Sequence, residues 1–212
     1  MISPKPVVLV HGINDSAAQF RPMARHLEGN GLPVHCLNLI PNNGDAGLDQ
    51  LAHQLASYVQ TNFADDQAID LVGFSMGGLV SRYYVQRLGC IRRVQRFITI
   101  ASPHRGTWTA FLRANPGARQ MRPGSPFLRD LNRDVAMLDR ISFASIWTPL
   151  DLMIVPATSS ILPVGRSIRV TVPAHPLMVR DPRVLRMVLQ LLVDGRQESP
   201  IYPAVTPAGS GR

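Results

Sequence analysis

The sequence contains almost no lysine: of its 22 basic residues only Lys5 is a lysine, and the others are arginines. These arginines are scattered along the chain, with no basic block, and aromatic residues are also scarce at 6% of 212 residues. Nucleic-acid-binding domains usually gather their basic residues in a patch or stripe. We therefore expect no nucleic-acid partner and interpret the formal net charge of +8 as mostly solvated surface.

Long apolar runs and cysteine motifs are missing as well. No run approaches the roughly 20 apolar residues of a membrane-spanning helix. The apolar run at 7–10 is shorter than the roughly 7 to 15 residues of a signal-peptide core, so we expect a cytoplasmic protein, with a processed secreted form as the alternative. Cys36 and Cys90 follow no metal-ligand or CxxC spacing, which leaves open two free thiols or one disulfide.

Short apolar, β-branched runs alternate with helical patterns along most of the chain. The runs VVLV and FITI are apolar without alternation, which is typical of strands buried on both faces of a parallel sheet. Helical spacing of apolar residues follows at 48–59 and 184–192. This alternation predicts an α/β fold with a mostly parallel sheet of about six strands and helices on both faces. The expected strands are 6–11, 34–39, 68–74, 96–101, 143–147 and 168–172.

The pattern predicts one domain over residues 1–196, followed by a loosely ordered tail at 197–212 that is rich in Pro, Gly and Ser. A long segment at 107–141 separates the fourth and fifth strands and is expected to be a cap or lid insertion. Apolar residues and arginines alternate in it. They are compatible either with transient contact with a membrane surface or with a cap packed on the core that has a solvated basic face.

The stretch DLVGFSMGGLV, residues 70–80, places Ser75 between an expected strand and an expected helix. Gly73 and Gly77 would permit a sharp turn that lifts the serine hydroxyl above the sheet edge, as a nucleophile requires. The alternative is an ordinary serine in a glycine-rich bend. As the first helical residue, Met76 would offer its N–H to a developing oxyanion.

A serine nucleophile needs a histidine base and an acid that orients it, in the chain order Ser, Asp or Glu, His. Only His104 and His175 follow Ser75. We prefer His175, because it lies between the last strand and the final helix, whereas His104 could shape the wall of the site.

Four aspartates and no glutamate lie between Ser75 and His175. Asp130, Asp134 and Asp139 alternate with arginines, which suits a solvated helix face. Asp151 lies in the apolar stretch TPLDLMIVP, where an unpaired carboxylate would be costly, so we expect it to pair with His175. A role limited to capping a turn is the alternative.

A second oxyanion donor is expected in the segment VVLVHGIND, which ends the first strand on the same sheet edge as Ser75. The backbone N–H of Ile13 is the candidate donor. We expect His11 to brace this loop rather than act as the base, because it precedes the serine.

The blocks VLVHGIND, GFSMGGLVSRYY, TIASPHRGT, WTPLDLMIVP and HPLMVRDPRVLRMVLQLL, in this order, resemble those of bacterial α/β-hydrolase lipases and esterases of the triacylglycerol-lipase type, including their compact forms. The resemblance covers most of residues 6–193. It implies an α/β-hydrolase fold, with Ser75, Asp151 and His175 as nucleophile, acid and base. It also implies that Ile13 and Met76 form the oxyanion hole.

The resemblance implies a serine carboxylic-ester hydrolase that acts on small-molecule or lipid acyl esters without a cofactor. Thioesterase, amidase or acyltransferase activity on the same triad is the alternative, and a non-catalytic interaction module is a third hypothesis. Two features depart from the family pattern. Pro176 directly follows His175 and restricts its backbone, and no aspartate pair suggests the calcium site of some related lipases, so no metal is expected.

Overall fold

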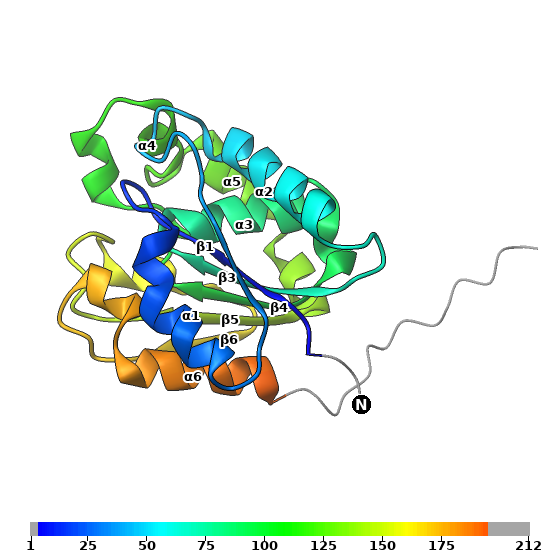
Figure 1. Cartoon of the computed structure of the whole chain (residues 1–212). Helices are drawn as coiled ribbons and strands as arrows, with labels where there is room; N and C mark the ends of the chain where they lie inside the picture. Colours follow the sequence, from blue (N-terminus) through cyan, green and yellow to red (C-terminus); the bar gives the residue numbers. More distant parts are fainter. Residues whose placement is uncertain (1–3, 195–212) are drawn as a thin grey trace, which may run out of the picture.

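The computed structural model describes residues 4–194 and contains a six-stranded sheet in the order β2-β1-β3-β4-β5-β6 (Figure 1). All five strand pairs in this sheet are parallel, which confirms the predicted α/β architecture. The strands are β1 (Val7–Val10), β2 (Val34–Leu37), β3 (Ile69–Phe74), β4 (Val94–Ile100), β5 (Ser142–Trp147) and β6 (Arg166–Arg169). The predicted tail at 197–212 lies outside the described residues.

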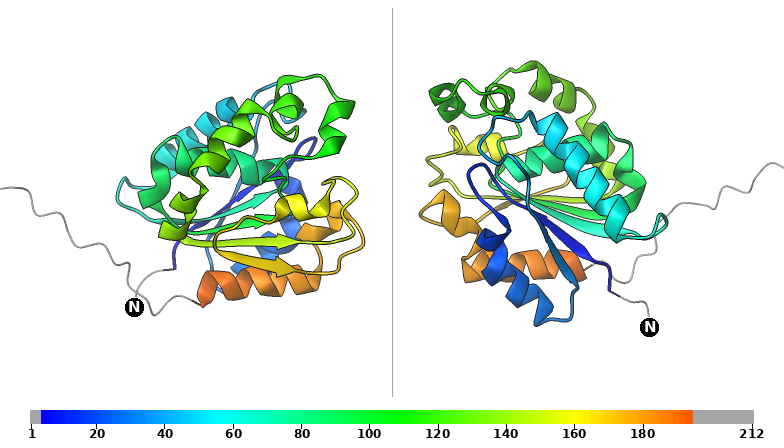
Figure 2. Two further views of the ribbon diagram at one scale, coloured as in Figure 1. Left: turned by 180° about the vertical axis from the view of Figure 1, so that it is seen from behind. Right: turned by 45° about the horizontal axis from the view of Figure 1, so that its top comes forward.

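Helices cover both faces of the sheet (Figure 2). One face carries α1 (Arg21–Glu28) and α6 (Pro182–Val193), and the other carries α2 (Leu48–Asn62), α3 (Met76–Gln86) and α5 (Pro126–Arg133). Alternate residues of β1 enter opposite cores: Val7 and Leu9 pack with the α1 and α6 side, whereas Val8 and Val10 pack with α2 and α3. All four are fully buried, because successive side chains of a strand point to opposite faces.

The last strand differs from its prediction at both ends. It was expected at 168–172, but β6 runs from Arg166 to Arg169. Val170 and Val172 are buried as the apolar pattern predicted. However, the N–H of Val172 bonds to the side-chain hydroxyl of Thr148 at 3.1 Å rather than to a strand, so the chain has left the sheet there.

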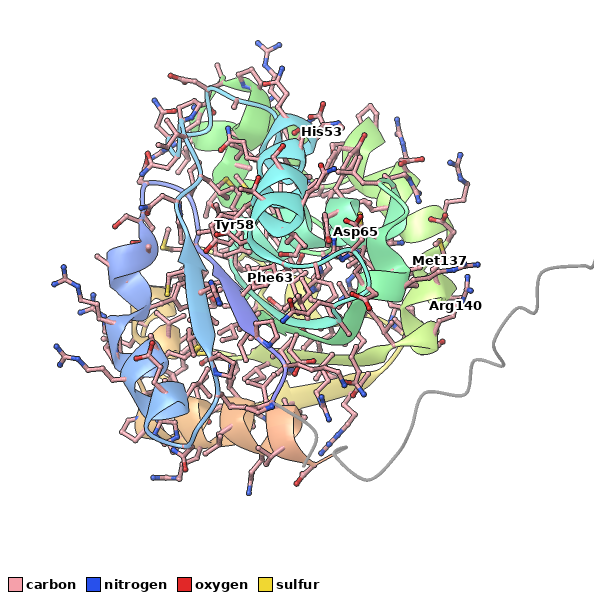
Figure 3. All side chains as sticks on the ribbon, turned by 45° about the vertical axis from the view of Figure 1, so that its right-hand side comes forward. His53, Tyr58, Phe63, Asp65, Met137 and Arg140 are labelled. Atoms are coloured by element: carbon pink, nitrogen blue, oxygen red, sulfur yellow. The ribbon has the colours of Figure 1, made fainter. Side chains whose placement is uncertain are left out.

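The edge strand β2 is covered by aromatic residues at the end of α2 (Figure 3). The His35 ring lies 4.8 Å from the Phe63 ring, and Phe63 lies 6.4 Å from Tyr58, as measured between ring centroids. Cys36 of β2 and Cys90 beyond α3 are both free thiols. Of the two alternatives that the sequence left open, two free thiols or one disulfide, the structure shows two free thiols.

The segment 107–141 forms short helical pieces: η3 (Trp108–Leu112), α4 (Pro116–Gln120), α5 and η4 (Val135–Arg140). Between residues 4 and 194, no helix is both long and apolar enough to cross a membrane. The sequence pattern suggested solvated aspartates on this segment. Asp130 and Asp134 are more than a third exposed, and they also form ion pairs with Arg87 at the end of α3.

A fully buried arginine fastens α5 to α3. The Arg82 guanidinium donates to Gln86 Oε1 at 3.0 Å, to Asn132 Oδ1 at 2.9 Å and to the Leu131 carbonyl at 2.8 Å. Burial lowers its pKa to about 9, so the side chain still carries its charge at neutral pH. The second half of the insertion is thus anchored to the core.

A buried ion pair joins the neighbouring strands β3 and β4. Arg96 Nη1 lies 3.3 Å from Asp70 Oδ2, and the Arg96 N–H donates to Asp70 Oδ1 at 3.1 Å. Burial raises the pKa of Asp70 to about 6, although the charge of Arg96 acts in the opposite direction. The pair therefore leaves a net cost of ionising Asp70 in the folded protein.

Arg82→Met should destabilise the protein, because it leaves the side-chain oxygens of Gln86 and Asn132 without their donor, whereas the Leu131 carbonyl keeps Gln86 Nε2 as a donor. Each such acceptor costs about 1 to 3 kcal/mol. Urea unfolding of R82M, with the exposed Arg133→Met as control, measures this loss. Equal free energies of unfolding in the two variants would show that the buried arginine does not anchor α5.

Asp70 should make stability depend on pH. Between pH 4 and 6 the folded protein holds a proton on Asp70 that the unfolded chain has released, so the free energy of unfolding falls as pH rises through this window. Asp70→Asn cannot titrate. Between pH 4.5 and 7.5, the free energy of unfolding measured with urea should fall by about 2 kcal/mol more in the wild type than in D70N. Parallel pH profiles of the two proteins would contradict the raised pKa of Asp70.

Candidate active site

Ser75 occupies a strained turn between β3 and α3. Its φ of 53° and ψ of −122° lie in a region that non-glycine residues rarely adopt. A Cβ atom on Gly77 would collide with the carbonyl oxygens of Val10 and His11, and one on Gly73 would collide with the backbone of Gly78. The two glycines thus let α3 begin directly against β1 and β3, and the structure supports the sharp turn rather than an ordinary bend.

The loop after β1 lies against this turn. A Cβ atom on Gly12 would lie 3.0 Å from Ser75 Cβ and 3.5 Å from Ser75 Oγ, so the loop backbone approaches the serine closely. His11 Nδ1 is 2.8 Å from the Gly12 carbonyl, and its Nε2 accepts the Leu39 N–H at 3.0 Å. Burial lowers the His11 pKa, and the neutral ring braces the loop through both nitrogens.

The two candidate oxyanion donors are the backbone N–H groups of Ile13, in the loop after β1, and of Met76, the residue that follows Ser75. Met76 begins α3, and the first N–H groups of a helix have no partner within it. Among residues 4–194, no acceptor is hydrogen-bonded to the N–H of Ile13. Both N–H groups are therefore available at the carboxyl edge of the sheet.

Asp151 and His175 form a buried pair. His175 Nδ1 lies 2.7 Å from Asp151 Oδ2, and the two side chains are 4% and 2% exposed. The other carboxylate oxygen, Oδ1, accepts the N–H groups of Met153 and Ile154, each at 2.9 Å. Asp151 thus both caps a turn and contacts His175, although the sequence suggested these as alternatives.

His175 begins the short helix η6 (His175–Val179), with Pro176 in its first turn. Proline is tolerated there because the first N–H groups of a helix are unpaired. The His175 ring packs beside the Phe74 ring at a centroid distance of 4.8 Å. Pro176 therefore fits the histidine loop.

A pocket of about 250 Å³ brings the predicted residues together. Its lining includes Gly12, Ile13, Ser75, Met153 and His175. Asp151 lies behind His175, and Met76 is buried beneath the turn. Of the five predicted site residues, Ile13, Ser75 and His175 thus line one pocket and Asp151 joins them through His175, whereas Met76 does not line it and no bond from Ser75 Oγ to His175 is formed.

The other candidates lie elsewhere. His104 is fully buried, and its Nε2 lies 2.9 Å from Thr99 Oγ1. Its carbonyl accepts from Asn132, and it does not line the pocket. Burial places its pKa well below the ordinary value, so it is a poor base. Asp139 accepts the N–H of Gly165; the two residues precede β5 and β6, at the sheet edge opposite to the site.

Sequence reasoning missed residues that hold the loops of the site. Thr148 Oγ1 donates to the Val172 carbonyl at 2.7 Å and accepts the Val172 N–H, so it links the end of β5 to the segment before His175. Gln19 lines the pocket and donates to the Pro176 carbonyl at 3.3 Å. A threonine three residues before Asp151 was a weak signal for a turn, and nothing near Gln19 distinguished it.

No cluster of three or more His, Cys, Asp or Glu residues suited to a metal ion occurs within the described part of the chain. The candidate site itself offers one hydroxyl, one imidazole with a carboxylate partner, and two backbone N–H groups. This set can transfer a proton, form a covalent bond and stabilise an oxyanion.

Two kinds of solved lipase share the fold. The mature form of Bacillus licheniformis lipase BlEst2 superposes with a TM-score of 0.75 at 18% identity, covering 91% of this chain and 93% of that one. Aspergillus fumigatus lipase B superposes with a TM-score of 0.76 at 20% identity, covering 89% and 52%. At these identities the similarity establishes the α/β-hydrolase fold.

Sequence comparisons point to lipases and to thioesterases. The chain is 34% identical over 110 residues to a triacylglycerol lipase of Pseudarthrobacter phenanthrenivorans. The aligned region covers 48% of this chain and 34% of that protein. It is 31% identical over 88 residues to palmitoyl-protein thioesterase 3 of Dictyostelium discoideum, covering 39% and 30%. The matches thus span about a third of the length of these curated relatives.

The family model described as palmitoyl protein thioesterase matches residues 6–130, which is more than half of the chain. This match includes the loop after β1, the Ser75 turn and most of the insertion. The protein is thus an α/β-hydrolase similar to bacterial lipases and esterases, and it belongs to the palmitoyl protein thioesterase family.

Proposed function

We propose that the protein is a serine hydrolase that cleaves acyl esters through an acyl-enzyme on Ser75. The observation that carries this proposal is the buried Asp151–His175 pair, with 2.7 Å between its carboxylate and imidazole, beside the pocket that Ser75 lines. Partial similarity to triacylglycerol lipases supports it further.

In the first half of the reaction, Ser75 Oγ attacks the ester carbonyl carbon and passes its proton to His175 Nε2. Asp151 holds Nδ1–H, which fixes the tautomer that can accept this proton, and stabilises the imidazolium. The carbonyl oxygen becomes an oxyanion and accepts hydrogen bonds from the N–H groups of Ile13 and Met76.

The intermediate then collapses as the bond to the leaving alcohol breaks and His175 returns the proton to that oxygen. In the second half, His175 takes a proton from water, and the resulting hydroxide attacks the acyl-enzyme. A second intermediate collapses, the carboxylic acid leaves, and Ser75 Oγ regains its proton from His175.

Exposed apolar side chains support lipid esters as the substrate class. Within residues 4–194, the exposed large apolar residues lie on segments that follow the carboxyl ends of β2, β4, β5 and β6, the sheet edge that also carries Ser75 and His175, and we call them the apolar rim. They are Ile40, Trp108, Phe111, Leu112, Leu150, Leu152, Met153, Val155 and Leu177. Exposed apolar side chains at this edge suit an acyl chain or transient contact with a lipid surface.

Thioesters are the second candidate substrates, favoured by the family model and by the Dictyostelium relative. The same steps apply, with a thiolate leaving group that takes its proton from His175. The acyl-enzyme is common to both reactions, so the preference depends on how the leaving group fits the pocket.

Ser75→Ala should abolish turnover, because the nucleophilic oxygen is removed. We expect kcat to fall at least about 1000-fold on both p-nitrophenyl palmitate and palmitoyl-coenzyme A, whichever the wild type prefers. A fluorophosphonate probe should label the wild type but not S75A. Ser81→Ala, which removes a buried hydroxyl without a partner among the described residues, is the control and should keep both activity and labelling.

The ratio of the two wild-type kcat/KM values decides between ester and thioester preference. Turnover and labelling that persist in S75A would refute the mechanism. An inert wild type that does not react with the probe would instead support a non-catalytic module.

The double substitution Leu112→Ser and Leu152→Ser should weaken use of long acyl chains. Both side chains are more than 80% exposed on the apolar rim, and burying a leucine contributes about 1.5 to 3 kcal/mol. We expect kcat/KM for aggregated p-nitrophenyl palmitate to fall at least about 10-fold while hydrolysis of soluble p-nitrophenyl butyrate stays within about twofold.

Arg140→Ser is the control for surface substitution, since Arg140 precedes β5 at the opposite edge of the sheet (Figure 3). It should leave the rates on both esters unchanged. Equal losses on palmitate and butyrate in the double variant would show that the apolar rim does not bind the acyl chain.

A further inference from the structure

The carboxylate of Asp151 depends on the turn that follows it. Its Oδ1 atom accepts the N–H groups of Met153 and Ile154, so the position of this turn sets the direction in which Oδ2 points. We call residues 151–155 the acid turn. Leu152, Met153 and Val155 are exposed on the apolar rim, so that Ile154 is the one apolar side chain of the turn that is buried.

A buried hydroxyl outside the triad holds the acid turn from the other side. Thr107, 4% exposed at the start of the insertion, accepts the Val155 N–H at 2.9 Å. Its Oγ1 also lies 2.9 Å from the Met153 carbonyl, to which it can donate. The next residue adds a third link, because the Trp108 N–H donates to the Val155 carbonyl at 2.9 Å.

The two partners of Thr107 are Met153, which Asp151 also binds, and Val155, which follows the second residue that Asp151 binds; Thr109 Oγ1 donates to the same Met153 carbonyl at 2.6 Å. Asp151 Oδ1 bonds to the N–H of Met153, and Thr107 contacts the carbonyl of the same residue. The carboxylate and the hydroxyl therefore both bind the backbone of Met153. Thr107 is itself fixed to the insertion, since its N–H donates to the Met121 carbonyl at 2.9 Å. A shift of this backbone would therefore move the carboxylate relative to His175.

We propose that Thr107 is a positioning residue for the reaction: its hydroxyl fixes the acid turn so that Asp151 Oδ2 meets His175 Nδ1. This inference rests on the proposed function of Ser75, His175 and Asp151. It also assigns a role to the base of the insertion, because η3 with its rim residues begins at the residue after Thr107.

The test separates positioning from stability. Thr107→Val keeps the size of the side chain but can neither accept from Val155 nor donate to Met153, whereas Thr107→Ser keeps both bonds. We expect T107V to lower kcat about 10- to 100-fold, with KM within about twofold, because a displacement near 1 Å in a catalytic group costs up to about 100-fold. T107S should restore kcat to within about threefold of the wild type.

Arg82→Met serves as the control for lost stability, because it weakens the anchor of α5 without touching the acid turn. At a temperature where all variants are folded, R82M should keep the wild-type kcat. If T107V does not fold, Thr107→Ala, which is smaller, carries the same comparison.

A second measurement needs no substrate. The proton on His175 Nδ1 that faces Asp151 should give a far-downfield resonance in proton NMR spectra of the wild type and T107S, and should shift upfield or broaden in T107V. This separates the two proposals: an inert wild type that keeps the resonance contradicts the proposed function alone.

Thr107 is only structural if T107V has a lower thermal midpoint but retains kcat and the downfield resonance. That outcome would overturn the inference. A loss of kcat in T107V that T107S does not restore would overturn it as well, since the hydroxyl would then not be the group that matters.

Discussion

A carboxylate buried in an apolar loop must have partners, and the site is organised around this requirement at Asp151. Its two oxygens contact two backbone N–H groups and the His175 ring, so neither is left unpaired. The pair in turn orients an imidazole beside the pocket that Ser75 lines. The loops after β5 and β6 can meet there because all strands are parallel and end at the same edge of the sheet.

The Ser75 turn and the loops that carry Asp151 and His175 are held in place by different kinds of contact. Ser75 and Met76 are set by rigid contact, since α3 starts directly on β1 and leaves room only for glycine at position 77. The acid and base loops are held by threonine hydroxyls: Thr148 links them to each other, and Thr107 links the acid turn to the insertion. The insertion is fastened to α3 through Arg82 at its far end, and its near end carries part of the apolar rim.

Much of the fold and of the candidate site could be predicted from the sequence, because the residues involved form short patterns along the chain. Unbroken apolar runs such as Val7–Val10 predicted strands buried on both faces, and an aspartate in an apolar stretch predicted a partner for Asp151. The end of the last strand could not be predicted, because Val172 is buried like a strand residue although its N–H bonds to a threonine side chain and not to the neighbouring strand. Thr107 and Gln19 were missed because their roles depend on distant backbone atoms, which no local pattern encodes.

We propose that Ser75 Oγ attacks the acyl carbon with His175 as its base, while the N–H groups of Ile13 and Met76 bind the acyl oxygen. A crystal structure of the protein inactivated with a long-chain alkyl fluorophosphonate tests it most directly. We predict a bond from Ser75 Oγ to phosphorus, with one phosphoryl oxygen accepting hydrogen bonds from both N–H groups and the alkyl chain lying along the apolar rim. Phosphorus bound to another residue, or a phosphoryl oxygen that faces away from Ile13 and Met76, would contradict the account.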